Sequence, residues 1–111
     1  MDYSKLSDRD INALVLQEIY GNQAKDKDVM RAWLHGKFKY TTNPADAWPI
    51  IRVNKIGITP PVVGHFWNCH FQDIEKYDPE KDRFKEYSHS SENPLRAAMI
   101  VFLMMQESQH A

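Results

Sequence analysis

An uninterrupted apolar run, Ala97 to Met105, limits the possible folds of this chain more than any other segment. Nine consecutive apolar residues leave no polar face on a helix, so such a helix must be covered on more than one side. Because the run is far shorter than the roughly 20 residues that cross a bilayer, we expect protein to cover it. Asn93 is a suitable N-cap and Pro94 fits the first helical position, which places the start of the helix.

Length and charge restrict the class of protein. With 111 residues the chain is long enough for its own hydrophobic core, and we expect residues 1–111 to form a single domain. The 14 basic and 15 acidic residues give a net charge of −1, which argues against binding of duplex nucleic acid. The single cysteine, Cys69, excludes an intrachain disulfide and is typical of a reducing compartment. The polar first ten residues carry no signal segment, so we expect a cytosolic protein without a membrane partner.

The segment from Ser7 to Gly21 is predicted to form an amphipathic helix. Ser7 and Asp10 resemble a capping box, and glycine is a common residue at the end of a helix. The apolar residues that share one helical face are Ile11, Leu14, Val15 and Ile19. The residues that point elsewhere are Arg9, Asn12, Gln17 and Glu18. This helix is therefore expected to cover the core with one side only.

A second helix-start signal, Asn43-Pro44, predicts a short middle helix. Pro49 lies inside it and should kink or shorten it, since proline removes a backbone hydrogen bond. The preceding segment, from Val29 to Tyr40, is ambiguous. Its alternating pattern favours two short strands joined at His35-Gly36, although the same residues also fit one helical turn.

Residues 56–89 are predicted to form an antiparallel sheet of three or more strands. The expected strands are a short one at 56–58, a well-alternating one at 62–73 and a returning one at 83–89, with a turn at 77–80. The fold class is therefore α+β. We expect the sheet to be sandwiched by the N-terminal amphipathic helix, the proline-containing middle helix and the buried apolar C-terminal helix.

Three blocks of the sequence resemble the NinX family of lambdoid phages and prophages: MDYSKLSDRDIN, NPADAWPIIRVNKI and NPLRAAMIVFLMMQE. The order of the predicted elements is also similar to the phage ABA sandwich domain. The resemblance implies an accessory phage protein that is made in the cytoplasm of the bacterial host. Proteins of this family have no assigned biochemical function, so the resemblance transfers no catalytic residue. Residues 22–39 and 59–91 match neither pattern closely, so these two regions are the candidates for recognising a specific ligand.

The residues best suited to bind a metal or to act as a nucleophile are His65, Cys69 and His70. In a strand His65 and His70 face opposite sides, and Cys69 lies roughly 13 Å from His65 at ~3.3 Å per residue, too far to share a zinc ion. A Cys69 nucleophile needs a base, for which His89 is the candidate, but apolar neighbours favour a buried and inert thiol. We expect no metal, no cofactor and no catalytic residue.

Arg96 has two interpretations. It falls at the third position of the C-terminal helix, where the helix dipole disfavours a cation by ~0.3–1 kcal/mol. An ion pair with a carboxylate such as Glu92, or contact with an aromatic ring, accounts for it structurally. Alternatively, capped helix ends bind an anion, and an aromatic ring stacks on a base if the ligand is a nucleotide. The candidate ligand-binding residues are Arg96, Asn93, Asn43, Trp33 and Tyr87.

These observations favour a non-enzymatic binding protein that captures a small anionic, nucleotide-like ligand to counter host defence. The alternative is a module that docks on a host or phage protein, and a third hypothesis is a small enzyme built on Cys69 and His89. The apolar C-terminal helix is covered either within one subunit or by a second copy. We expect a homo-oligomer.

Overall fold

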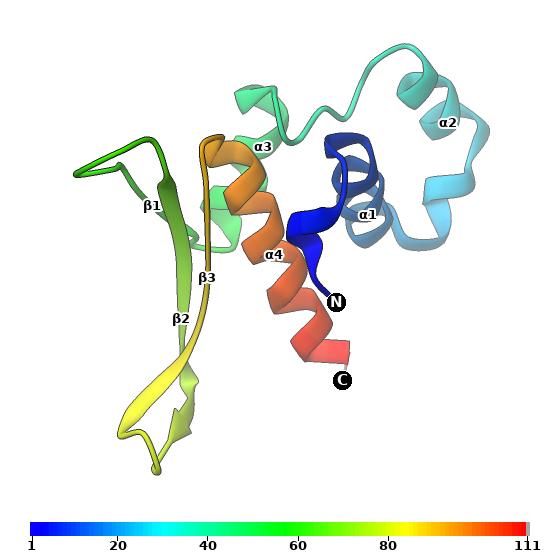
Figure 1. Ribbon diagram of the computed structural model, residues 1–111. Coiled ribbons are helices and arrows are strands. Elements are labelled where there is room, and N and C mark those ends of the chain that lie inside the picture. The colour runs from blue at the N-terminus through cyan, green and yellow to red at the C-terminus, as the bar shows by residue number, and fades with distance from the viewer. Residues whose placement is uncertain (111) are drawn as a thin grey trace.

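The computed structural model describes residues 1–110, which fold into helices packed on one three-stranded sheet (Figure 1). The α-helices are α1 (Asp8–Tyr20), α2 (Lys27–Leu34), α3 (Pro44–Val53) and α4 (Pro94–His110). The 3-10 helices η1 (Tyr3–Lys5) and η2 (Gly21–Lys25) flank α1. The strands are β1 (Gly57–Thr59), β2 (Trp67–Asp78) and β3 (Arg83–Ser91). The predicted α+β class is confirmed.

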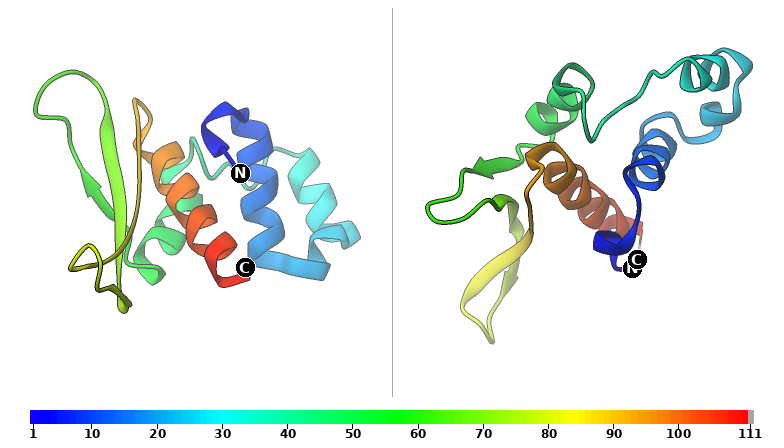
Figure 2. Two further views of the ribbon diagram at one scale, coloured as in Figure 1. Left: turned by 60° about the horizontal axis from the view of Figure 1, so that its bottom comes forward. Right: turned by 45° about the horizontal axis from the view of Figure 1, so that its top comes forward.

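Helix α4 is the central layer of the molecule. The sheet packs against one side of it, α1 against the other, and α3 also contacts it (Figures 1 and 2). Asn93 caps the helix as predicted, because its Oδ1 accepts the backbone N–H of Leu95. Every residue from Ala97 to Leu103 is buried. One subunit therefore covers the apolar run by itself.

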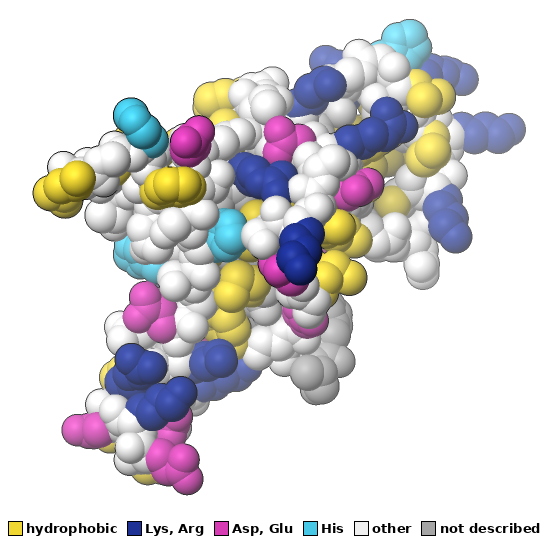
Figure 3. Space-filling view, in the orientation of Figure 1, with side chains coloured by type: hydrophobic (Ala, Val, Ile, Leu, Met, Phe, Trp, Pro, Cys, Tyr) yellow, Lys and Arg dark blue, Asp and Glu magenta, His cyan; other side chains and the backbone are white. Residues whose placement is uncertain are grey.

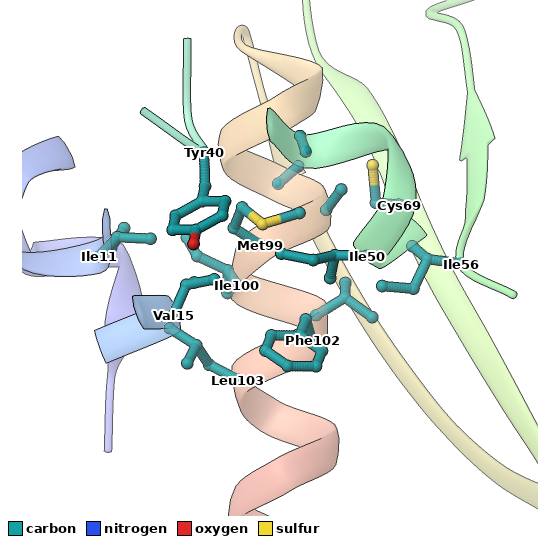
Figure 4. Packing of buried hydrophobic residues seen from close by; sticks show 14 of the residues in the cluster. Ile11, Val15, Tyr40, Ile50, Ile56, Cys69, Met99, Ile100, Phe102 and Leu103 are labelled. Atoms are coloured by element: carbon teal, nitrogen blue, oxygen red, sulfur yellow. The ribbon is translucent and has the colours of Figure 1, made fainter. Parts of the chain in front are cut away.

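The hydrophobic core surrounds α4 (Figure 4). Side chains of α1 approach the helix from one side, and side chains of α3 and the strand region approach from the other. The residues that show this in Figure 4 are Ile11 and Val15 from α1, Ile50 from α3, and Ile56 and Cys69 from the strand region. Burial of large aliphatic side chains contributes ~1.5–3 kcal/mol each, so this ring of contacts dominates the stability of the domain.

The predicted ends of α1 are confirmed, and so is most of its predicted buried face: Ile11 and Val15 are fully buried and Leu14 packs on the core. Ser7 caps the helix and Gly21, at φ +54°, ends it.

Two residues of α1 differ from the prediction. Asn12, which the hydrophobic pattern places on the polar face, is buried, whereas Ile19 is 47% exposed. The reason is a hydrogen bond: Asn12 Oδ1 accepts the backbone N–H of Thr41 at 3.0 Å. A polar side chain is tolerated in the interior when it is paired in this way.

The prediction of two strands within residues 29–40 is wrong. The first part of this segment is helix α2, and the rest is an extended connection to α3 (Figure 1). Asp26 starts the helix, since its side chain accepts the backbone N–H of Asp28. Apolar residues recur here at the helical spacing of four as well as at the strand spacing of two. The pairs at helical spacing are Val29 with Trp33, and Met30 with Leu34.

The middle helix and the sheet agree with the predicted elements but differ at their ends. Asn43 caps α3, and the helix continues through Pro49 as far as Val53. The strands are antiparallel in the order β1-β2-β3. Strand β2 begins later than predicted, at Trp67, so residues 62–66 form an exposed loop, and the turn between β2 and β3 is at 79–82. No helix within residues 1–110 combines the length and the apolar character that crossing a membrane requires.

Replacement of Met99 tests how strongly the stability of the domain depends on the packing of α4. Met99 is fully buried, so Met99→Ala should lower the free energy of unfolding by about 2–5 kcal/mol, through lost contacts and the cavity left behind. Met30→Ala, at a side chain that is 43% exposed on α2, is the matched control and should stay within about 0.5 kcal/mol. Urea unfolding followed by circular dichroism measures both. Equal losses for the two variants would contradict the central role of α4.

Candidate functional site

The Arg96 guanidinium makes three hydrogen bonds inside the protein. Its Nη1 donates to Asp8 Oδ1 at 2.8 Å, and its Nη2 donates to the backbone oxygens of Leu6 at 2.6 Å and Ser4 at 3.2 Å. The side chain is 18% exposed. Arg96 thus fastens the N-terminal segment and the start of α1 to α4, and the internal ion pair is the interpretation that the geometry supports, with Asp8 as the partner and not Glu92.

The other end of the N-terminal segment is also held by α4. Tyr3 donates its hydroxyl hydrogen to Glu107 Oε2 at 2.8 Å, and the terminal ammonium group of Met1 pairs with Glu107 Oε1 at 3.1 Å. Burial raises the pKa of Tyr3 to about 12, with a further contribution from the neighbouring Glu107 carboxylate. The phenol therefore stays protonated and able to donate at neutral pH.

The predicted ligand residues do not converge on one site. Asn43 caps α3, with its Oδ1 accepting the backbone N–H of Ala45. Tyr87 lies in β3, is buried, and donates its hydroxyl hydrogen to Ser108 Oγ at 2.7 Å. Asn93 caps α4 and also donates from Nδ2 to the backbone oxygen of Thr41 at 2.6 Å. Of the five predicted residues, Trp33 alone is among the residues that line the pocket described next.

A pocket of about 220 Å³ lies where α1, the end of α2 and the connection to α3 meet. Its volume is below the ~300–1,000 Å³ typical of sites for drug-sized molecules, so it suits a small ligand or one group of a larger ligand. We call it the Trp33 pocket. Its lining residues are Asp8, Arg9, Asn12, Trp33, Lys37, Phe38, Lys39, Thr41 and Thr42.

The pocket combines an aromatic ring with several cations. The Arg9 guanidinium carbon lies 5.7 Å from the centre of the Trp33 ring, a distance typical of cation–π contact. Lys37 and Lys39 also line the pocket, while Asp8, its one carboxylate, is already paired with Arg96. None of the three cations has an ion-pair partner among the described residues. Lys and Arg side chains are spread over this end of the molecule in Figure 3.

Local backbone geometry places the two lysines. Helix α2 ends in a Schellman motif, in which Gly36 adopts φ +85° and the backbone N–H of Lys37 bonds to the oxygen of Ala32 at 2.9 Å. Phe38 then adopts φ +64°, a conformation that costs energy for a residue with a Cβ.

Aromatic contacts hold Phe38 in that conformation. Its ring meets Tyr20 edge to face at 5.5 Å and stacks with Tyr40 at 6.2 Å, measured between ring centres. Backbone strain that the surrounding packing maintains is found at binding sites more often than elsewhere. The strained residue lies between the two pocket lysines, so the packing of Phe38 also sets the direction of the chain through the pocket wall.

Thr41 forms a buried part of the pocket wall. The residue is fully buried, and its backbone is fixed by Asn12 on one side and Asn93 on the other. Its hydroxyl oxygen, Oγ1, has no hydrogen-bond partner in the described part of the protein. An unpaired buried hydroxyl costs ~1–3 kcal/mol, so a group that paired with it would gain that amount.

Sequence reasoning missed most of this pocket. The alternation Lys37-Phe38-Lys39 is a signal of cations interleaved with an aromatic residue, but the same alternation also fits the predicted strand. The hydrophobic pattern assigns Arg9 only to the polar face of the first helix. Its contact with Trp33 joins residues 24 positions apart, and no local pattern predicts such a pair.

Cys69 and His89 are brought opposite each other on β2 and β3. Burial raises the pKa of the Cys69 thiol to about 11, and its Sγ–H donates to the backbone oxygen of Pro94 at 3.4 Å. Burial, reinforced by the charge of Arg96, lowers the pKa of His89. A thiol with so high a pKa is almost entirely protonated at neutral pH and is a poor nucleophile.

Comparison with known proteins assigns the chain to a family. Residues 2–106 match the family described as bacteriophage P22 NinX. The chain belongs to the phage NinX family. A search of curated proteins and a search of solved structures each give no match. The three sequence blocks that resemble NinX therefore mark a true membership. In this NinX protein the first block supplies the α1 side of the Trp33 pocket, whereas the lysines of the pocket lie outside all three blocks.

The structural role of the Arg96 contacts can be tested by measuring the free energy of unfolding of Arg96 variants. Arg96→Ala should lower the free energy of unfolding by about 1.5–3 kcal/mol, because it removes hydrogen bonds in which the donor is charged. Arg96→Lys should recover only part of the loss, since one ammonium group cannot reach all three acceptors. Arg52→Ala, at an exposed arginine of α3, is the control and should change stability by less than about 0.5 kcal/mol. A loss for Arg96→Ala no larger than the control would contradict the structural role.

Proposed function

We propose that this NinX protein is a non-enzymatic binding protein that captures a small anionic ligand in the Trp33 pocket. The observation that carries the proposal is the set of three cations, Arg9, Lys37 and Lys39, around one aromatic ring and one small cavity. Their charge is not neutralised by an ion pair among the described residues, since Asp8 is held by Arg96. An anion in the pocket would supply the missing countercharge.

The chemistry of the pocket favours an anion attached to a flat ring. The lysine ammonium groups and the Arg9 guanidinium are suited to phosphate or carboxylate oxygens. The indole of Trp33 offers a face for stacking, which is worth ~1–3 kcal/mol for a nucleobase. A mononucleotide carries both groups, so a nucleotide-like signal of the infected cell is the ligand class that we propose. Its capture would counter a host defence that uses such a signal.

This proposal moves the ligand site away from the two helix ends that the sequence indicated. Arg96 uses its donors on Asp8 and on backbone oxygens, and Asn93 uses both ends of its amide inside the protein. Neither group is available to a ligand without breaking these contacts. Both instead support the pocket indirectly, through Asp8 and Thr41.

A role without catalysis fits the chemistry of Cys69. Its thiol is buried and hydrogen-bonded, and its raised pKa keeps it protonated at neutral pH. No pair of nucleophile and base in the Trp33 pocket suggests group transfer, because the pocket combines cations, hydroxyls, amides and one ion-paired carboxylate. The pocket residues are suited to binding and not to turnover.

A protein-docking module is a second candidate, supported by the loop between β1 and β2. Val62 is 97% exposed, Val63 is 91% exposed and Phe66 is 61% exposed. We propose, as the alternative, that this apolar loop inserts into an apolar pocket of a host or phage protein. The discriminating result is a complex from infected cells that holds no small molecule. It is lost in Val62→Ser/Val63→Ser and kept in Val53→Ser, which changes an exposed valine of α3.

The homo-oligomer remains a proposal, but the apolar helix α4 no longer supports it. The apolar residues of α4 are covered within one subunit, so they require no second copy. Native mass spectrometry of the gently purified protein reports the mass of the assembly and any retained small molecule in one measurement.

Titration with two probes tests ligand capture. We expect adenosine 5′-monophosphate and, more weakly, inorganic phosphate to bind the protein in isothermal titration calorimetry. Lys37→Gln and Lys39→Gln should each weaken binding about tenfold, equivalent to ~1.4 kcal/mol, because each removes one charge-assisted contact. Trp33→Leu should weaken the nucleotide more than phosphate, since only the nucleotide has a base to stack.

The control for the lysine variants is Lys81→Gln, which removes the same charge from the turn between β2 and β3. It should leave both affinities unchanged. Absence of affinity for either anion contradicts the proposal, and so does binding that the three pocket variants leave as it is.

A further inference from the structure

Helix α2 is attached to the rest of the molecule more loosely than any other α-helix. None of its residues is buried, and its main contact is with η2, which directly precedes it. Figure 1 and the right-hand view of Figure 2 show it at the far end of the molecule, away from the sheet and α4. The one ion pair of α2 within the described residues, Asp28 with Arg31, stays inside the helix. Little stability is lost when such an element separates from the core.

Glycines with left-handed backbone angles lie on both sides of α2. Gly21 has φ +54° and starts η2, and Gly36 has φ +85° and follows α2. A Cβ added to Gly21 would meet no atom within 4 Å, so this position lies in open space. Glycine changes its backbone angles at lower cost than other residues, which makes Gly36 a suitable hinge. On the other side the movable point is the junction of η2 with α2, because η2 packs on α1 and its Ala24 is buried.

Two partly buried side chains hold α2 against the core, Val29 and Trp33. The defined contact of Trp33 is the cation–π contact with Arg9 of α1. Such a contact contributes ~0.5–1 kcal/mol when it is exposed to water, which is weak enough to break and reform rapidly at room temperature.

The buried hydroxyl of Thr41 gives an independent reason for movement. It belongs to the wall of the Trp33 pocket, yet it is shielded from solvent and has no partner in residues 1–110. A ligand can reach this hydroxyl only when the wall shifts. Thr41 itself is fixed to Asn12 and Asn93, so the part of the wall that can shift is the one that carries Trp33, at the end of α2.

We propose that α2 is a hinged lid of the Trp33 pocket, which swings about Gly36 and about its junction with η2 at Asp26, and closes when Trp33 contacts Arg9 and the ligand. The lid opens in the free protein to admit the anion, and the bound anion then holds Trp33 in place. The part that concerns the ligand rests on the proposed function, whereas the opening itself is a property of the free protein.

Hydrogen exchange followed by mass spectrometry tests the opening without a ligand. Amides of α2 should exchange together and more than about tenfold faster than those of α1 and α4, because they open without global unfolding. Arg9→Ala should speed exchange in α2 a further few-fold. Arg31→Ala is the matched control, since it removes an arginine charge from the lid itself without touching Trp33. Exchange of α2 at the rate of α1 and α4, or equal effects of the two variants, would overturn the lid.

The same measurement with adenosine 5′-monophosphate separates the two proposals. If the nucleotide binds and slows exchange in α2 while α4 is unchanged, the lid closes on the ligand. If calorimetry shows binding but exchange in α2 stays the same, the lid is overturned and ligand capture stands. If calorimetry shows no binding, ligand capture fails, and the exchange of the free protein still decides whether α2 opens.

Discussion

Burial of α4 on all sides is the constraint on which the rest of this NinX structure depends. A helix without a polar face needs two covering layers, and the chain supplies the sheet on one side and α1 on the other. These two helices lie at opposite ends of the chain, because α1 is the first α-helix and α4 is the last. No short connection therefore holds them together. Side-chain contacts hold them together instead. Arg96 binds the N-terminal segment and the start of α1 to the first half of α4, and Glu107 binds Tyr3 to the second half.

The Trp33 pocket is a consequence of how this core is closed. The segment that connects α2 to α3 runs past α1 and the start of α4. Hydrogen bonds to both hold its backbone at Thr41. The backbone N–H of Thr41 bonds to Asn12 of α1, and its backbone oxygen accepts from Asn93 at the start of α4. One wall of the pocket is therefore as rigid as the core. The facing wall, which carries Trp33, belongs to a helix with no buried residue. A rigid wall and a loosely held wall meet at one cavity.

Local signals account for what the sequence predicted, and long-range contacts account for what it did not. The caps at Ser7, Asn43 and Asn93 are set by residues two or three positions away, so they were predictable. Helix α2 was missed because its apolar residues satisfy two periods at once. The burial of Asn12 depends on a partner 29 positions away. The pairing of Arg96 with Asp8 spans 88 positions, and no pattern near Arg96 identifies that carboxylate.

The same distant pairing gives Arg96 an electrostatic role in a pocket that it does not line. Asp8 does line the pocket, and an unpaired carboxylate there would repel an anion and partly neutralise Arg9, Lys37 and Lys39. Arg96 holds that carboxylate in an ion pair at 2.8 Å, and it is itself largely shielded from solvent. The positive potential of the three cations is thereby preserved. The arginine at the unusual third helical position stabilises the fold by direct contact. For the proposed ligand capture it has a second role, because it neutralises the one carboxylate of the pocket that would oppose an anion.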